Sequence, residues 1–356
     1  MNFYFLYFLV AASIFGFIAA FSLISVYAER KISAFIQDRL GPMETGKFGW
    51  LQTIADILKL IQKEYIVPTA ADKVLFTLAP IIIFLAVYLG FVALPWAPGL
   101  VPASMNIGVL YIFAIISIEA LGILMAGWGS NNKYSLLGAV RSVAQMVSYE
   151  IPAGFALISV IMIAQTLDLQ LINLNQGILA SNEIRFLGFI DVKHIGGILA
   201  WNVFQAPHLL IAYGIYFIAS LAECNRAPFD LPEAESELIG GFHTEYTGLR
   251  FGFIFLAEYA MMFLVAMFGV TLFLGGWNTP FPNFGAFKLA EYTTGIFWGI
   301  FWIMGKSLLV VALQMWIRWT LPRFRVDQLM TLCWKVLTPL AFACLVFSGL
   351  WRLLLF

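Results

Sequence analysis

The first 28 residues read MNFYFLYFLVAASIFGFIAAFSLISVYA (residues 1–28) and carry no charged side chain. An α-helix needs about 20 consecutive apolar residues to cross the hydrocarbon core of a bilayer. The run is too long for the apolar core of a signal peptide, and no small-residue cleavage site follows it. We therefore expect this segment to form a retained membrane-spanning helix.

The whole chain has the composition of a membrane protein. Of its 356 residues, 62% are hydrophobic and 11% are charged, whereas a soluble domain is about half apolar and a quarter charged. This difference argues against a soluble globular enzyme. Lys and Arg together number 20, as do Asp and Glu, so the formal net charge is zero. That balance excludes a basic nucleic-acid-binding protein of the usual kind.

The apolar stretches predict an all-α polytopic membrane protein that forms a single membrane domain over residues 1–356. The uncharged stretch from Val74 to Ile118 is broken by Pro95-Trp96-Ala97-Pro98-Gly99, which indicates two spans joined by a short turn. About eight spans of bilayer length are expected. They are residues 3–28, 74–94, 107–127, 145–165, 204–221, 252–275, 293–318 and 329–353.

The distribution of basic residues orients these spans. If residue 1 lies outside, the inside loops are residues 29–73, 128–144, 222–251 and 319–328, and together they contain 13 Lys and Arg. The outside loops contain only Arg185, Lys193 and Lys288. Since inside loops are enriched in Lys and Arg, we expect the N-terminus to lie outside. We expect the membrane to be a bacterial inner (plasma) membrane, with an organellar membrane as the alternative.

The first inside loop contains a helical pattern of another kind. Between residues 47 and 66, apolar side chains recur at helical spacing, and polar ones fall on the opposite face. The apolar set is Trp50, Ile54, Ile57, Leu58, Ile61 and Tyr65, and the polar set is Gln52, Asp56, Lys59 and Lys63. This pattern predicts an amphipathic helix in the membrane interface. One interpretation is a surface anchor, and the other is a helix that roofs a binding cavity and carries a partner protein.

The chain offers no evident metal or redox site of its own. Cys224, Cys333 and Cys344 form no Cys-x-x-Cys pair, and the three histidines have no metal-ligand spacing. An iron–sulfur cluster needs about four thiolates, and structural zinc needs four Cys or His ligands. We therefore expect no metal and no bound redox cofactor in this chain.

Ionisable residues also fall inside the predicted spans. Those with charged side chains are Glu119, Glu150, Glu258, Lys306, Arg318, Lys335 and Arg352. Ionisable groups are costly inside a membrane and mark functional sites by default, although those near helix ends can reach water instead. Pro152 follows Glu150 by two residues, so the carbonyl of Ser148 loses its helical donor. We expect this position to serve as a proton relay or a hinge.

The third inside loop has the densest group of charges. They are Glu223, Arg226, Asp230, Glu233, Glu235, Glu237 and Glu245. Closely spaced carboxylates in a poorly solvated place cannot all ionise, so some of their pKa values rise and they can pass protons near neutral pH. The alternative is an acidic loop in water. Apolar neighbours such as Phe229 and Leu238 favour the first interpretation.

Four groups of segments then give the sequence a specific resemblance. The first is Ala28–Lys31, Gln37–Pro42, Leu51-Gln52, Ala55-Asp56 and Lys59-Leu60; the second is Gly129–Ser135, Arg141, Ala144-Gln145 and Ser148–Pro152; the third is Ala222–Leu238; and the fourth is Thr244–Gly248 with Ala257–Tyr259. In order and spacing they resemble the H subunits of NADH-quinone oxidoreductases, the family of respiratory complex I membrane subunits that meet the hydrophilic arm at the quinone site. Thr247 stands where the family is expected to have Ser.

This resemblance implies a membrane subunit of a proton-pumping NADH:quinone oxidoreductase, a translocase of respiratory electron transport. Quinone, the substrate, would enter from the bilayer between the first span, the sixth span and the amphipathic helix. Iron–sulfur clusters and FMN would be held only by partner subunits. The implied partners are the hydrophilic subunits of the quinone site, the small membrane subunits, membrane lipid and quinone, but no nucleic acid.

The resemblance also implies roles for individual residues. Those expected at the quinone channel and partner contact are Arg30, Arg39, Asp56, Lys59 and Arg226. Those expected to couple protons are Glu119, Glu150, Glu223, Asp230, Glu233, Glu235, Glu237 and Glu258. Arg141 and Arg226 are expected to be their counter-charges. We expect loop 222–251 to be a two-state element that responds to the quinone.

Three alternatives stay open at this point. A ferredoxin-dependent quinone reductase or a membrane-bound hydrogenase would use a similar membrane subunit. A proton-coupled transporter would act without partners. A purely structural anchor would gain nothing from charges as deep as Glu119 and Lys306.

Overall fold

The computed structural model describes residues 3–180, 183–231, 239–283 and 288–355, and these residues are mostly helical. Seven of the helices described are long and apolar enough to cross a membrane. They are α1 (Phe3–Ile36), α3 (Lys73–Ala93), α4 (Gly108–Gly129), α5 (Lys133–Ala164), α10 (Gly248–Phe273), α12 (Ile296–Thr320) and the continuous helix Val326–Leu355. α8 (Pro207–Glu223) is apolar but shorter. The predicted all-α polytopic membrane fold is confirmed.

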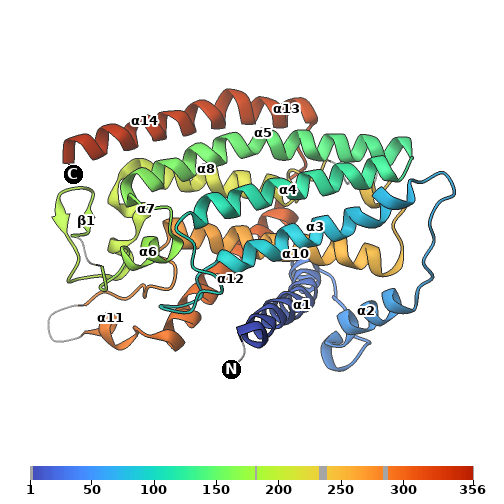
Figure 1. Ribbon diagram of the computed structural model, residues 1–356, viewed down its shortest axis with the longest axis horizontal. Coiled ribbons are helices and arrows are strands. Elements are labelled where there is room, and N and C mark those ends of the chain that lie inside the picture. The colour runs from blue at the N-terminus through green and yellow to red at the C-terminus, as the bar shows by residue number, and fades with distance from the viewer. Residues whose placement is uncertain (1–2, 181–182, 232–238, 284–287, 356) are drawn as a thin grey trace.

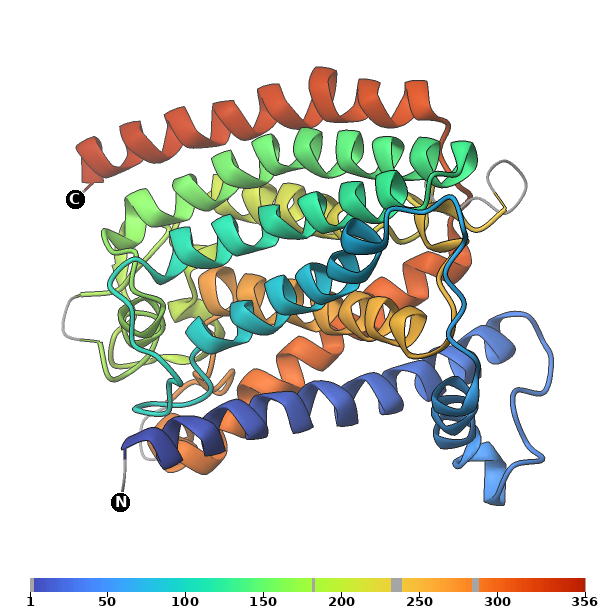
Figure 2. The same cartoon turned by 45° about the vertical axis from the view of Figure 1, so that its right-hand side comes forward.

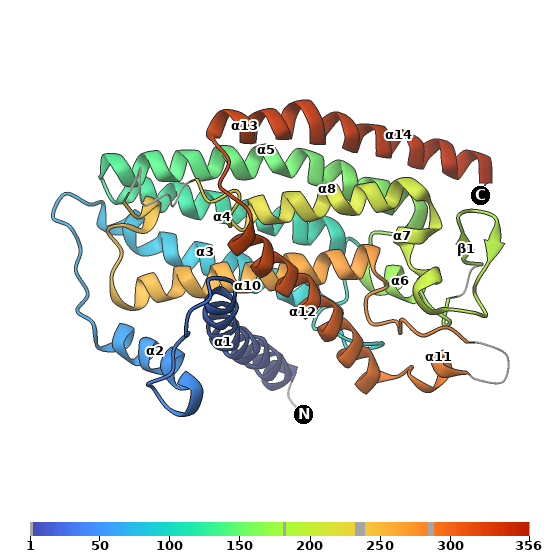
Figure 3. The same ribbon diagram turned by 180° about the vertical axis from the view of Figure 1, so that it is seen from behind.

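The last long helix changes its winding along its length. It consists of α13 (Val326–Thr331), the π-helical turns of η4 (Leu332–Leu337) and α14 (Thr338–Leu355). A π-helical stretch, with hydrogen bonds between residues five apart, is uncommon in proteins. Figures 1 and 3 both show α13 and α14 running beside α5.

Short elements gather at the two ends of the bundle. η1 (Lys47–Gly49) and α2 (Gln52–Gln62) lie at one end, with η3 (Gly241–His243) just before α10. The other end has the antiparallel hairpin β1 (Arg185–Phe186) and β2 (Ile190–Asp191), with α6 (Leu169–Leu174), η2 (Gly197–Ala200), α7 (Asn202–Gln205) and α11 (Leu289–Tyr292). Figure 2 shows both chain ends on the same side of the bundle, at this second end.

α10 is the central helix of the bundle. It packs against α1, α3, α8 and α12, and 78% of its most apolar window is buried, compared with 28% for α1 and 22% for α12. The ring of Phe263 on α10 lies 4.6 Å from that of Phe21 and 6.2 Å from that of Phe91, measured between centroids. A helix that is apolar all round is expected at such a buried position.

Two helices extend beyond the spans predicted for them. α1 continues to Ile36 rather than ending at residue 28, so Glu29 and Arg30 are helical residues. α5 begins at Lys133 rather than residue 145, because the Asn132 side chain caps it by accepting a hydrogen bond from the Tyr134 N–H at 2.9 Å. The connection between α4 and α5 is therefore much shorter than the predicted loop 128–144. Hydropathy locates the bilayer crossing, whereas capping locates the helix end.

The amphipathic helix is shorter than predicted, since α2 covers residues 52–62 rather than 47–66. Gly49 has a φ of 76°, and a Cβ atom there would approach the Pro42 carbonyl oxygen to 2.2 Å. Glycine is therefore required at this turn, which stops the helix from starting earlier. At the other end Lys63 is extended, with φ −71° and ψ 136°. The apolar spacing that predicted the longer helix continues past both ends of α2, to Trp50 on one side and Tyr65 on the other.

Candidate functional site

A buried ion cluster lies near the C-terminal end of α1. Glu29 is 4% exposed, and its carboxylate accepts hydrogen bonds from Arg226 Nη1 at 2.8 Å and from Tyr259 Oη at 2.7 Å. Arg318 Nη1 donates to its other oxygen. These donors come from the segment after α8, from α10 and from the last turn of α12. Since buried charges require paired and hydrogen-bonded partners, Glu29 joins four parts of the chain.

Arg226 remains charged in this cluster. Burial by itself lowers the pKa of the guanidinium, but the adjacent Glu29 carboxylate outweighs burial and raises that pKa above its ordinary value. The guanidinium also lies 4.4 Å from the centroid of the Tyr259 ring, a cation–π contact. The sequence interpretation made Arg226 a counter-charge for the third-loop acids, whereas the structure pairs it with Glu29.

A cavity of about 270 Å³ lies between α1, α2 and α10, and we call it the apolar cavity. Its lining includes Ala19 and Leu23 of α1, Ile57 and Leu60 of α2, and Leu256 of α10. Arg30 and Asp56 also line it, and their side chains form an ion pair of 2.6 Å between Nη1 and Oδ2. This pair is more than a third exposed, so it contributes little to stability. It links α1 to α2 across the cavity wall.

A second cavity of about 300 Å³, the charged cavity, adjoins the first. It is lined by Glu29, Arg39, Arg226, His243, Glu258 and Arg318, among others. Val26, Arg30 and Phe255 line both cavities. The apolar cavity therefore lies next to the cavity that contains the buried ion cluster.

His243 is a histidine of the charged cavity that lies in η3, outside the membrane spans. Its ring lies 5.1 Å from that of Phe242 and 5.5 Å from that of Phe251. Burial lowers its pKa to about 4, and the nearby Asp230 carboxylate opposes this effect. The imidazole is therefore neutral near pH 7.

A third cavity, the acid cavity, has a volume of about 10 Å³, close to the smallest volume that holds one water molecule. Glu119, Glu223 and Glu258 line it. Glu119 and Glu223 are 5% and 4% exposed, and Glu119 Oε2 has no hydrogen-bond partner within the described part of the chain. Glu258 lines both the charged and the acid cavities, so the three cavities form one series.

The other predicted acids lie beside this series. Glu150 is half-buried on α5. Asp230 is buried and accepts a hydrogen bond from Arg323 Nη2 at 2.9 Å. Glu233, Glu235 and Glu237 lie outside the described residues.

Arg39 and Lys59, two of the basic residues predicted at the quinone channel, lie in different surroundings. Arg39 lines the charged cavity and donates hydrogen bonds to Gln37 Oε1 at 2.7 Å and Ser33 Oγ at 3.3 Å. Lys59 is exposed on α2. Arg39 thus joins Arg30 and Arg226 at the cavities, while Lys59 presents its charge on the surface.

Sequence reasoning missed the centre of the site. The sequence singles out Glu29 only as part of the segment Ala28–Lys31 that carries the resemblance, and Arg318 only as a charged residue within a predicted span. One signal was available, because Glu29 is the first charge after 28 uncharged residues. Nothing local distinguishes Tyr259 from the other tyrosines. Its role depends on the packing of α10 against α1.

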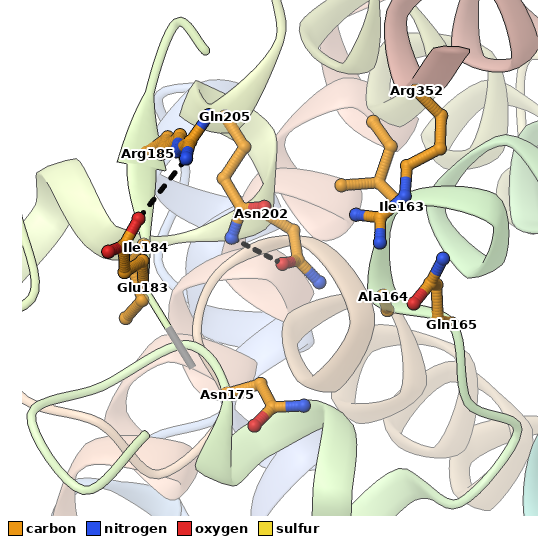
Figure 4. Close-up of a pocket in the computed structure, with 10 residues that line it drawn as sticks. All are labelled: Ile163, Ala164, Gln165, Asn175, Glu183, Ile184, Arg185, Asn202, Gln205 and Arg352. Carbon is orange, nitrogen blue, oxygen red and sulfur yellow. Dashed lines mark hydrogen bonds and ion pairs between the residues drawn. The ribbon is translucent and has the colours of Figure 1, made fainter. Parts of the chain in front are cut away.

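A separate polar cavity of about 290 Å³ lies at the opposite end of the bundle from α2. Figure 4 shows Gln165 at the end of α5, Arg352 on α14, and Asn202 and Gln205 on α7 around it. Gln205 Nε2 donates to Asn202 Oδ1 at 3.0 Å. Of the predicted site residues that the structure describes, none lines this cavity.

The fold and the three adjoining cavities define a class: an all-helical membrane protein whose buried acids lie behind an apolar cavity. Comparison with known proteins identifies the family. The profile of a family described as NADH dehydrogenase matches residues 9–349. A relative from Cytophaga hutchinsonii, an NADH-quinone oxidoreductase H subunit, is 54% identical over 94% of this chain and 96% of its own length.

Two further relatives are also named as H subunits of NADH-quinone oxidoreductase. The one from Chlorobium luteolum is 54% identical over 97% of this chain and 88% of its own. The one from Bacteroides fragilis is 42% identical over 92% and 86%. The chain belongs to the NADH dehydrogenase family, among the H subunits of NADH-quinone oxidoreductase. The predicted resemblance is confirmed, and the chain is part of an oxidoreductase complex.

Proposed function

We propose that this chain forms the passage by which quinone reaches its reduction site, together with the first part of the proton path that quinone reduction drives. The observation that carries the proposal is the series of three cavities. An apolar cavity between α1, α2 and α10 adjoins a charged one, which shares Glu258 with a cavity between buried acids.

The apolar cavity suits the hydrocarbon tail of a quinone. Ligand pockets for apolar molecules are concave and lined mainly by apolar side chains. Ala19, Ile57 and Leu256 meet this description from three different helices. α1 and α2 also have large apolar residues exposed on their surfaces, so a quinone leaving the lipid can pass between them.

The charged cavity and the buried acids suit proton coupling. Reduction of a quinone takes up two electrons and two protons, so it changes the charge near the headgroup. In a poorly solvated site such a change acts strongly on nearby charges. Glu258 lines both cavities, and Glu119 and Glu223 lie behind it. With Glu150, Asp230, Glu233, Glu235 and Glu237 they form our proposed proton path.

Electrons reach the quinone from partner subunits. The sequence has three cysteines in all, fewer than the four thiolates that an iron–sulfur cluster usually needs. We place the iron–sulfur clusters and FMN in the hydrophilic subunits, docked at the end of the bundle that carries α2. Small membrane subunits and lipid would cover the apolar faces, and the membrane would be a bacterial inner membrane.

A substitution that fills the apolar cavity tests the proposal. Ala19→Trp would obstruct the space between α1, α2 and α10, and Leu309→Trp on the exposed face of α12 is the matched control. In the assembled complex we expect Ala19→Trp to slow reduction of a long-tailed quinone more than that of a short-tailed one. NADH oxidation by a soluble artificial acceptor should be unchanged. Equal rates with both quinones in the variant and the control would refute a quinone passage here.

A further inference from the structure

α5 contains an interior proline, Pro152, two residues after Glu150. Pro152 has no N–H, so the carbonyl of Ser148 loses the helical donor four residues along the chain. In the structure Cys333 Sγ donates to this carbonyl at 3.1 Å. Ser148 is 7% exposed and Cys333 is fully buried. A thiol of η4 thus occupies the place of the missing backbone donor.

The surrounding contacts hold Cys333 in position. Cys333 lies in the π-helical turns of η4, and the Thr338 hydroxyl donates to its carbonyl at 2.8 Å. The residue next to Ser148 is tied to the same helix, because Tyr149 Oη donates to the Leu329 carbonyl at 3.0 Å. Two neighbouring residues of α5 are therefore bonded to one long helix of the C-terminal region.

The same C-terminal segment contacts the third inside loop. Arg323 Nη2 donates to Asp230 at 2.9 Å, and the Phe324 N–H donates to the Pro228 carbonyl at 3.1 Å. The Phe229 ring lies 5.6 Å from the Phe324 ring and 5.3 Å from the Tyr149 ring. Residues 323–333 thus connect the loop that follows Glu223 with the part of α5 that carries Glu150.

We infer that Cys333 is a positioning residue: its thiol replaces the hydrogen bond that Pro152 removes and sets the bend of α5 that directs Glu150 toward the proton path. This inference rests on the proposed function of Glu150. A thiol is a weak hydrogen-bond donor. The contact therefore holds the bend, but α5 straightens more easily than a helix in which every backbone hydrogen bond is made. Helix bends are caused by proline or by groups inserted into the ladder, and both are present here.

The contact itself can be measured without reference to activity. A hydrogen-bonded thiol absorbs at a lower S–H stretching frequency than a free one, and Cys333→Ser identifies which band belongs to Cys333. Pro152→Ala restores an N–H that can donate to the Ser148 carbonyl. We expect this substitution to move the Cys333 band in the purified complex to higher frequency. Pro80→Ala removes the interior proline of α3 and should leave the band in place.

The consequence for coupling is tested with a double-mutant cycle. Cys333→Ala should lower coupled NADH:quinone reduction by about two- to tenfold, the effect of one neutral hydrogen bond, and Cys333→Ser should retain most of the rate. On the Pro152→Ala background the same Cys333→Ala change should have little effect. Equal effects on both backgrounds, or an unmoved S–H band in Pro152→Ala, would overturn the inference.

If Pro152→Ala does not assemble, the comparison of Cys333→Ala with Cys333→Ser still decides. Rescue by serine supports a donor at this position, and equal loss in both variants rejects it. Glu150→Gln separates the two proposals. Full proton pumping in that variant would contradict the proton path itself, whereas the S–H band reports the contact between Cys333 and α5 in either case.

Discussion

The carboxylate of Glu29 is the common acceptor for two arginines and a tyrosine, so its charge matters more than its size. Glu29→Gln keeps the shape but leaves Arg226 and Arg318 without their carboxylate. Breaking a buried ion pair by removing one partner costs about 3–5 kcal/mol. We expect the variant to lower the thermal stability of the assembled complex and its quinone reductase activity. Glu44→Gln, which changes an exposed residue between α1 and α2, should change neither; equal stability of the two variants would contradict the role of Glu29.

His243 predicts a pH dependence with a definite sign. Its pKa in the folded chain is about 4, below the ordinary value of 6.5, so the folded state disfavours the protonated ring. The stability that this neutral histidine provides is complete above pH 6.5 and is lost as the pH falls toward 4. His243→Gln should therefore flatten the dependence of melting temperature on pH in this window.

The matched control for this measurement is His194→Gln. His194 is exposed and should leave the pH dependence of stability as it is in the native chain. If His243→Gln gave the same slope as the native complex between pH 4 and 6.5, the protonation of His243 would have no part in acid destabilisation.

At the level of single residues, the sequence was sufficient to pick out those buried acids that stand alone in an apolar segment. Glu119 and Glu258 were found this way, since a carboxylate inside a span is visible without a structure. Glu29 was not, because it stands at the edge of a charged segment where solvent is the ordinary expectation. Its importance follows from Arg226, which lies almost 200 residues further along the chain.

At the level of elements, Lys306 caps the C-terminal end of α10. Its Nζ donates to the carbonyls of Leu274, Gly276 and Asn278 at 2.8, 2.9 and 2.7 Å and lies 4.2 Å from the centroid of the Trp201 ring. Cations stabilise the C-terminal end of a helix, where carbonyls are left without donors. The deep lysine that the sequence marked as functional thus supports the helix that lines all three cavities.

Lys306→Met removes all three hydrogen bonds. Leaving a buried carbonyl without a donor costs about 1–3 kcal/mol, so we expect a marked fall in the melting temperature of the complex. Lys288→Met breaks only an exposed pair with Glu291 and should have almost no effect. A small monovalent cation such as ammonium should partly restore the melting temperature of a complex that carries Lys306→Ala. Unchanged stability in Lys306→Met would show that α10 needs no cap.

The ends of elements were harder to predict than their existence. Hydropathy located the core of each long helix, but α5 begins where Asn132 caps it and α2 begins only after Gly49. Both ends depend on local hydrogen bonds or steric fit that an apolar periodicity does not contain. The cavity between α1, α2 and α10 was anticipated, because the resemblance supplied which helices meet.

For the whole molecule, the orientation is a prediction that labelling can check. Asp191 lies on the exposed hairpin β1–β2, at the end of the bundle where the chain ends lie. Lys47 lies just before α2, at the opposite end of the bundle. Each can be replaced by cysteine. The three native cysteines are buried. We expect a membrane-impermeant thiol reagent to label Asp191→Cys from outside the cell and Lys47→Cys only in inverted vesicles. The reverse pattern would contradict the positive-inside assignment.

The two sides of the apolar cavity differ in what surrounds them. α10 is 78% buried over its most apolar window and is capped by Lys306, whereas α1 is only 28% buried. A helix exposed to lipid adjusts its tilt when its length does not match the thickness of the bilayer, and a helix enclosed in protein is shielded from this mismatch. Lipids with shorter or longer acyl chains should therefore move α1 relative to α10. In the proposed quinone passage, the width of the cavity would then be a property that the cell sets through its choice of fatty acids.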